Sequence, residues 1–350
     1  MVTASCVPVH AHAEDSDQED VSSTTPLELS AEKISQLKGR IMDETQPMEK
    51  RNRCVFTLCA VRTEPSIDAL SECLKSKTCS ELLKHEIAYV LGQMKSYHAV
   101  PVLIQTLEDE SEAVIVRHEA AEALGAIGQK DSIGVLTKYL EDPSIEVRET
   151  CQIAIDRILY FEKRRHEGKP SEVECLSMYD ELMLGQTDEE EMSKMFQSVD
   201  PAPSSLLEGT EQARIERAKV CKRGHQTTEY RGLFALRDIG TDAAVHAMIE
   251  GFSDSSALFR HEVAFVMGQL QSPASKEILT KVLCDANEHE MVRHEAAEAL
   301  GAISTDDTVE ILQKHLKDEH GMVRESCSVA LDIHQYFHSD QFQYADGLNE

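Results

Sequence analysis

Two stretches of the chain, Arg117–Ile127 and Arg293–Ile303, both read RHEAAEALGAI, and the second begins 176 positions after the first. The same offset relates Lys84–Gln93 (KHEIAYVLGQ) to Arg260–Gln269 (RHEVAFVMGQ). An identity of eleven residues and a similarity of ten at one fixed offset indicate that half of the chain has been duplicated.

Each half is itself periodic. Two His-Glu pairs lie 33 residues apart in each half, and each unit of this length contains a helical apolar pattern, an acidic turn and a second helix of the form Val-Arg-x-x-Ala-x-x-Ala-Leu-Gly. Two such helices cannot bury their apolar faces alone, but stacked neighbours can. The repeat resembles HEAT repeats. We therefore expect an all-α fold, an α-solenoid of eight HEAT-like hairpins, four in 33–165 and four in 210–338.

The negative charge is concentrated in two segments. The 350 residues carry a formal net charge of −28; residues 1–32 hold seven acids and no Lys or Arg, and residues 166–212 hold twelve acids and two lysines. Both segments lack apolar periodicity, so they cannot bury enough surface to offset the entropy of ordering. We expect a disordered tail over 1–32, a flexible acidic linker over 166–209 and a short C-terminal tail over 339–350.

Composition excludes several classes of function. The sequence contains no run of about 18 apolar residues, so it predicts no transmembrane helix. The start of the chain has neither the basic nor the apolar part of a secretory signal, so we expect a cytoplasmic protein. A strongly acidic chain is a poor nucleic-acid binder, because phosphate contacts need clustered Lys and Arg. The ten cysteines match no zinc spacing. We expect a monomer that binds neither membrane nor nucleic acid.

The four repeated His-Glu pairs are the strongest functional signal. They occupy one register of the repeat, in the central units only; the outer units carry Glu149-Thr150 and Glu325-Ser326 instead. Packing alone would not require two polar residues at this register in the central units only. Two other His-Glu dipeptides, at 166 and 289, have no counterpart at the 176 offset, and we expect them to be unrelated to function.

This pattern predicts metal ligation. Equivalent positions on stacked inner helices lie about 10 Å apart, so two facing halves would gather four His and four Glu around one centre. Imidazole with carboxylate suits non-heme iron, and also manganese or zinc; two His and one carboxylate with open positions is the oxygen-activating iron pattern. Two such sets suggest a dinuclear centre. Glu122 and Glu298, four residues after a His, either orient that His or face outward.

These tandem pairs on HEAT-like inner helices, with an acidic linker between the halves, resemble the deoxyhypusine hydroxylase family over about 33–338. The resemblance implies a deoxyhypusine monooxygenase. Such an enzyme uses molecular oxygen and two Fe²⁺ ions per chain, held between the halves, to hydroxylate the deoxyhypusine side chain of translation initiation factor 5A to hypusine. The long tail and linker depart from shorter members of the family but do not touch the motifs.

The resemblance also implies roles for individual residues. One iron would be held by His85, His118 and Glu119, and the other by His261, His294 and Glu295. Glu86 and Glu262 would face the substrate amines as catalytic acids, and Gly92 and Gly268 would allow close approach of the substrate along the groove.

Two other classes of function remain open from the residues. A pure interaction scaffold would use the concave face of the solenoid to bind proteins, but it leaves the His-Glu register unexplained. A dinuclear metallohydrolase would use a metal-bound hydroxide, would favour zinc or manganese, and would need neither oxygen nor reductant.

Overall fold

The structure is a computed structural model that describes residues 29–166, 210–220 and 226–339. Residues 1–28, 167–209 and 340–350, which contain nearly all of the predicted tail, linker and C-terminal tail, lie outside the described residues. All regular structure in the described ranges is helical, as the repeat pattern predicts.

The helices follow one another in antiparallel pairs, and successive pairs stack. The α-helices of the first half are α1 (Ala31–Met42), α2 (Met48–Val61), α3 (Glu64–Leu74), α4 (Glu81–Gln93), α5 (Val100–Glu108), α6 (Val114–Ile127), α7 (Ser132–Lys138) and α8 (Ile145–His166). Those of the second half are α11 (Glu211–Val220), α12 (Gln226–Ile239), α13 (Asp242–Ile249), α14 (Ala257–Leu270), α15 (Lys276–Cys284), α16 (Glu290–Ile303), α17 (Asp306–His315) and α18 (Gly321–Phe337). Short 3₁₀ helices are η1 (Tyr97–Ala99), η2 (Tyr139–Glu141), η4 (Glu250–Ser253) and η5 (Pro273–Ser275).

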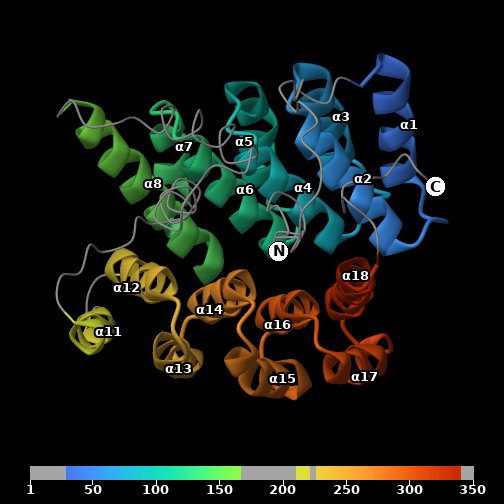
Figure 1. Cartoon of the computed structure of the whole chain (residues 1–350). Coiled ribbons are helices and arrows are strands. Elements are labelled where there is room, and N and C mark those ends of the chain that lie inside the picture. The colour runs from blue at the N-terminus through green and yellow to red at the C-terminus, as the bar shows by residue number, and fades with distance from the viewer. Residues whose placement is uncertain (1–28, 167–209, 221–225, 340–350) are drawn as a thin grey trace, which may run out of the picture.

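The two halves form two rows of helices that face each other (Figure 1). In each row the inner helices are the second members of the pairs; α4 packs on α6, α6 on α8, α14 on α16 and α16 on α18. The rows also meet crosswise at their ends, because α18 contacts α2 and α4 while α8 contacts α12 and α14. The predicted all-α solenoid is confirmed, and the arrangement brings the four His-Glu registers to the space between the rows.

Small residues allow the inner helices to approach closely. A Cβ atom on Gly92 would lie 2.9 Å from the Cα atom of Ala123, and one on Gly125 would lie 2.9 Å from the Cα atom of Ala154. Contacts this short leave no room for a side chain, so the repeated Ala-Leu-Gly pattern sets the spacing between stacked helices.

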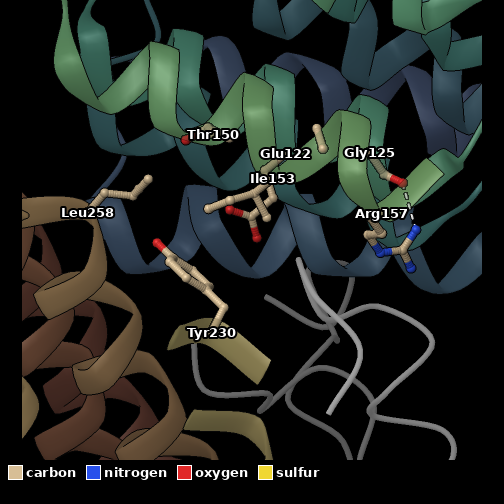
Figure 2. A pocket seen from close by; sticks show the side chains of 8 residues that line it. Glu122, Gly125, Thr150, Ile153, Arg157, Tyr230 and Leu258 are labelled. Carbon is tan, nitrogen blue, oxygen red and sulfur yellow. Dashed lines mark hydrogen bonds between the residues drawn. The ribbon is translucent and has the colours of Figure 1, made fainter. Parts of the chain in front are cut away.

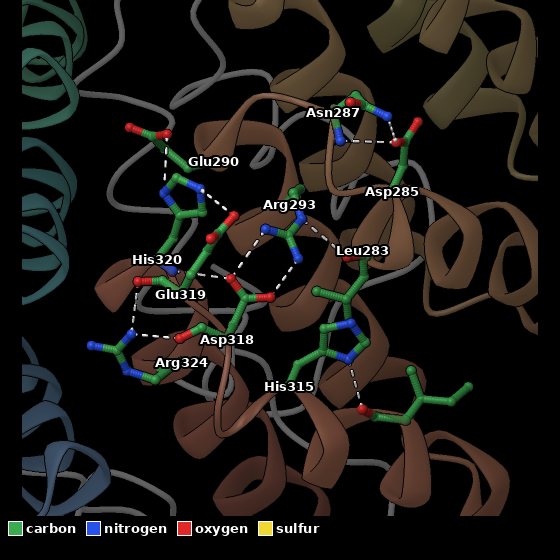
Figure 3. A network of polar contacts seen from close by, with 11 residues as sticks. Leu283, Asp285, Asn287, Glu290, Arg293, His315, Asp318, Glu319, His320 and Arg324 are labelled. Atoms are coloured by element: carbon green, nitrogen blue, oxygen red, sulfur yellow. Dashed lines mark hydrogen bonds and ion pairs between the residues drawn. The ribbon is translucent and has the colours of Figure 1, made fainter.

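A buried arginine joins successive repeats just before each of two inner His-Glu pairs, and Figure 3 shows one of them, Arg293. Arg293 donates from Nε to the carbonyl oxygen of Leu283 (3.1 Å) and from its two terminal nitrogens to the carboxylate of Asp318 (3.1 and 2.5 Å). Arg117 makes the same contacts with Leu107 and Asp142. Burial alone would raise the pKa of Asp318, but the hydrogen bonds from Arg293 lower it. The arginine therefore fixes the start of each His-bearing helix against the next repeat.

Two hydrogen bonds tie the halves together with the symmetry of the duplication. Ser80 Oγ caps α4 by accepting from the Leu83 amide (3.4 Å) and donates to Glu325 Oε2 (2.6 Å). Ser256 Oγ caps α14 in the same way and donates to Glu149 Oε2 (2.6 Å). The outer-unit glutamates that replace the His-Glu pairs therefore bind the first turns of the opposite half's His-bearing helices.

At one end of the interface, further polar contacts join α2 to α18. Arg53 forms a two-pronged ion pair with Asp332 (2.8 Å for each contact), and Ser328 Oγ donates to Glu49 (2.8 Å). The two halves are therefore held together by direct contacts between their side chains.

Replacing Arg293 with Ala should lower the free energy of unfolding by about 3–5 kcal/mol, since it leaves a partly buried carboxylate and a carbonyl without their cation. Arg324→Ala is the matched control, because Arg324 is exposed and donates to the carbonyl oxygens of Asp318 and Glu319 in the turn before α18. Urea unfolding monitored by circular dichroism measures both variants. Equal losses of stability would contradict the role assigned to Arg293.

The two glutamates that bind the opposite half, Glu149 and Glu325, should make the free energy of unfolding depend on pH. Burial raises the pKa of Glu149 and of Glu325, although their serine hydrogen bonds act in the opposite direction. A raised folded-state pKa stabilises the fold below the unfolded pKa, about 4.3, and this stabilisation is lost as pH rises through the folded value. The unfolding free energy of the wild type, relative to a Glu149→Gln/Glu325→Gln variant, should therefore fall as pH rises above about 4. A difference that does not change with pH would contradict this.

Candidate metal centre

The four repeated histidines converge on one point between the rows. His85 lies on α4, His118 on α6, His261 on α14 and His294 on α16; three are completely buried and His261 is 6% exposed. The ring centroids of His85 and His118 are 5.6 Å apart, and those of His261 and His294 are 5.3 Å apart. Across the halves, His85 lies 5.4 Å from His294 and His118 lies 5.8 Å from His261. Four side chains separated by up to 209 residues therefore share one site.

The glutamates of the four pairs are also buried in this centre. His85 Nε2 lies 3.2 Å from Glu119 Oε2, and the matching distance from His261 Nε2 to Glu295 Oε2 is 3.4 Å. Each first-pair histidine therefore faces the glutamate of the second pair in its own half. The duplicated sequence produces a duplicated geometry.

The ring nitrogens of the four histidines lack hydrogen-bond partners from the part of the protein that the structure describes. Within the described residues, neither ring nitrogen of the four histidines has a partner in hydrogen-bond geometry, and the same holds for both carboxylate oxygens of Glu86. Burying polar groups without partners costs several kcal/mol in total, at about 1–3 kcal/mol for each group. A cation bound between the rows would give these nitrogens and oxygens the partner that they lack.

Burial disfavours the protonated form of three of the imidazoles and opposes ionisation of two carboxylates. It lowers the pKa of His118 well below its usual range, and the other three imidazoles add to the effect. Burial also lowers the pKa of His261 and His294. It raises the pKa of Glu86 to about 8, with a contribution from the nearby Glu298 carboxylate, and that of Glu119 to about 8, with a contribution from Glu295. Neutral imidazoles are the form that ligates metals, and cations would restore the ionised carboxylates.

The donor atoms fit a nitrogen- and oxygen-ligated transition metal. One nitrogen or oxygen of each of His85, His118 and Glu119 lies within 4.8 Å of the others, and the same is true of His85, His261 and His294. The first group is the predicted ligand set of one iron. The second group crosses the halves, so the structure brings the two predicted sets together as one centre. Neither group contains a cysteine, which is the donor pattern of imidazole and carboxylate sites.

The two glutamates that the sequence left open differ in the structure. Glu298 is buried, accepts a hydrogen bond from Ser326 Oγ (2.9 Å) and has its Oε1 3.8 Å from His294 Nδ1, so it is placed to orient that histidine. Glu122 is only partly buried and lines a cavity between the halves.

Other predicted residues also have defined positions. His289 caps α16 by accepting a hydrogen bond from the Met291 amide (3.2 Å), a structural role that agrees with its lack of a repeat partner. Gly92 packs against Ala123, which explains this glycine by helix packing, and Gly268 is buried at the matching place in α14. Their suggested part in substrate approach stays a prediction. Sequence reasoning missed Ser80 and Ser256, although both recur at the 176 offset just before a His-Glu pair.

One more group of possible ligands lies away from this centre. Asp306, His334 and His338 come within 4.8 Å of one another at the C-terminal end, where Asp306 and His338 are exposed to solvent.

No helix in the part of the chain that the structure describes combines the length and the apolar character needed to cross a membrane.

The chain should bind two metal ions, and His118→Asn or His294→Asn should reduce the content to one or fewer, because each change removes a buried ligand. The double variant His334→Asn/His338→Asn is the control and should retain two ions. Elemental analysis after anaerobic loading with Fe²⁺ and dialysis gives the count. Retention of two ions by the His118 and His294 variants would contradict the assignment.

Comparison with known proteins agrees with the fold. A model of HEAT repeats matches residues 67–156 and 233–332. The deoxyhypusine hydroxylase of Dictyostelium discoideum is 44% identical over 323 residues, which cover 91% of this chain and 95% of that protein. The human deoxyhypusine hydroxylase is 38% identical over 322 residues, covering 92% and 98%.

A solved structure of human deoxyhypusine hydroxylase in complex with glycerol superposes with a TM-score of 0.74 at 37% identity, covering 87% of this chain and 97% of that one. The repeat architecture, the buried His-Glu centre and similarity over nearly the full length of these relatives lead to one conclusion. This chain belongs to the deoxyhypusine hydroxylase family.

Proposed function

We propose that the chain hydroxylates the deoxyhypusine side chain of translation initiation factor 5A to hypusine, in an oxygen-dependent reaction. The observation that carries this proposal is the convergence of four buried histidines and their glutamates between two halves of a chain from this family. We place the reaction in the cytoplasm. We also propose that the enzyme acts as a monomer, because one duplicated chain supplies both halves of the centre.

The centre is proposed to hold two Fe²⁺ ions, one by His85, His118 and Glu119 and the other by His261, His294 and Glu295. Breaking an unactivated C–H bond exceeds what acid–base side chains achieve, and a pair of iron ions supplies the activation of molecular oxygen that the reaction needs. The protein's part is to fix the ligands. Arg293 and Ser80 do this from outside the centre, by holding the start of α16 and α4.

Glu86 and Glu262 are proposed to face the substrate. Each directly follows a histidine of the centre and is buried (1% and 3% exposed). Deoxyhypusine carries amino groups that are cationic at neutral pH, and a buried carboxylate attracts and orients such a group strongly because little water screens it. Two acids related by the duplication offer two places where an amine can be held beside the metals.

The acidic surface supports a basic partner. A net charge of −28 attracts a positively charged segment of a partner protein over a distance of about 8–10 Å at physiological salt. Association with the deoxyhypusine-bearing factor is therefore proposed to weaken as salt rises.

The variants Glu86→Gln and Glu262→Gln should keep two irons but lower the rate by about 100-fold, since the substrate amine loses the charge that positions it. The exposed Glu110→Gln is the control and should keep full activity. The assay follows the mass of deoxyhypusine-bearing factor 5A with the iron-loaded chain in air and under nitrogen. No oxygen-dependent mass gain with the iron-loaded wild type would overturn the proposal, and activity with zinc alone would indicate a hydrolase.

A further inference from the structure

The duplication is broken on one side of the metal centre. Most positions around the centre are identical or similar at the 176 offset, but Cys54 becomes Tyr230, Thr150 becomes Ser326 and Arg157 becomes Ile333. These positions lie on the inner helices α2, α8, α12 and α18, which close the interface at its two ends. The two ends of the centre are therefore chemically different.

At the α18 end, the glutamate four residues after the second histidine, Glu298, is hydrogen-bonded within its own half. Glu298 is 2% exposed, accepts from Ser326 Oγ and lies beside His294. Its carboxylate also adds to the raised pKa of Glu86, after the larger effect of burial. The equivalent of Ser326 in the first half, Thr150, donates instead to the carbonyl oxygen of Glu146 (2.8 Å), so it does not close the other end in this way.

At the α8 end, a cavity lies between the halves (Figure 2). It has about 240 Å³ of empty space, its opening to solvent included, and α6 and α8 of one half and α12 and α14 of the other line it. Ile153 and Leu258 give it apolar walls, and Glu122 and Tyr230 add polar groups. Glu122 follows His118 by one helical turn, so the cavity begins one turn from the metal centre.

Tyr230 is the unexplained group of this cavity. Its side chain is 1% exposed, yet its hydroxyl has no hydrogen-bond partner among the described residues. In Figure 2 the hydroxyl points into the space toward which the Glu122 carboxylate also points. Burial raises the pKa of Tyr230 well above its usual range, and the nearby carboxylates of Glu262 and Glu122 add to the shift. The hydroxyl is thus neutral and surrounded by acids.

Among the described residues that line the cavity, the one cation is held away from this space. Arg157 donates to the carbonyl oxygen of Gly125 (2.6 Å), and its guanidinium lies over the ring of Phe161, 4.9 Å from the centroid. The Tyr230 end is therefore apolar-walled and acidic. This is the environment that suits an alkyl chain bearing a cationic amine.

We infer that the substrate side chain enters the centre through this cavity, with an amine N–H donating to the hydroxyl oxygen of Tyr230 and with Glu262 and Glu122 supplying the negative charge. The inference rests on the proposed function and adds a direction to it. The side chain enters from the α8 end, beside Glu262, while the Glu86 and Glu298 end stays closed to entry and Glu86 faces the substrate only from inside the centre. Tyr230 is then a substrate-positioning residue that breaks the symmetry of the duplicated centre.

The test is Tyr230→Phe in the full-length iron-loaded chain, with Cys54→Ala, at the matching position of the other end, as control. Binding of deoxyhypusine-bearing factor 5A is titrated under nitrogen, where no turnover occurs, and KM is measured in air. Loss of a hydrogen bond to a charged amine should weaken binding and raise KM about tenfold or more. Metal content should stay at two, and the unfolding midpoint should not fall, because the deleted hydroxyl has no hydrogen-bond partner among the described residues.

The outcomes separate the two claims. A wild type that binds or hydroxylates no deoxyhypusine-bearing factor 5A contradicts the proposed function itself. A wild type that is active, with Tyr230→Phe binding as tightly as the wild type, overturns the inference. It is also overturned if Cys54→Ala weakens binding equally, or if Tyr230→Phe acts only by lowering stability or metal content.

Discussion

Burial of four imidazoles and their glutamates between two rows of helices is the constraint on which the structure depends. Polar groups removed from water without partners are costly, and here eight ring nitrogens lack hydrogen-bond partners among the described residues. A cation bound among these groups would compensate for this cost. The lowered pKa of His118 and the pKa of Glu119 raised to about 8 have the same cause, because both follow mainly from desolvation.

The duplication explains how one chain builds such a centre. Each half supplies two ligand-bearing inner helices, and the outer-unit glutamates Glu149 and Glu325 hold the opposite half through Ser256 and Ser80. Because each of these serines also caps a His-bearing helix, closure of the halves and the position of the ligands are coupled. Arg117 and Arg293 add a second restraint within each half. The substrate entry that we infer lies where this symmetry is broken, at Tyr230.

The sequence predicted the architecture and the central residues because both depend on periodicity. The spacing of the His-Glu pairs placed His85, His118, His261 and His294 in one register, and helix stacking then required them to meet. The polar contacts across the halves were not predictable, because Ser80 and Glu325 are 245 residues apart and nothing local links them. The different environments of Glu122 and Glu298 were not predictable either. Their helices have nearly the same sequence, and differences in neighbouring helices, such as Thr150 against Ser326, separate them.

The central claim is that both halves of the chain hold two iron ions in one nitrogen- and oxygen-ligated centre. Iron X-ray absorption on the fully loaded chain tests it directly. The account predicts scattering from nitrogen and oxygen ligands and a metal–metal component at no more than about 4 Å. A spectrum with sulfur ligands, or one that shows isolated iron ions with no metal–metal component, would contradict it.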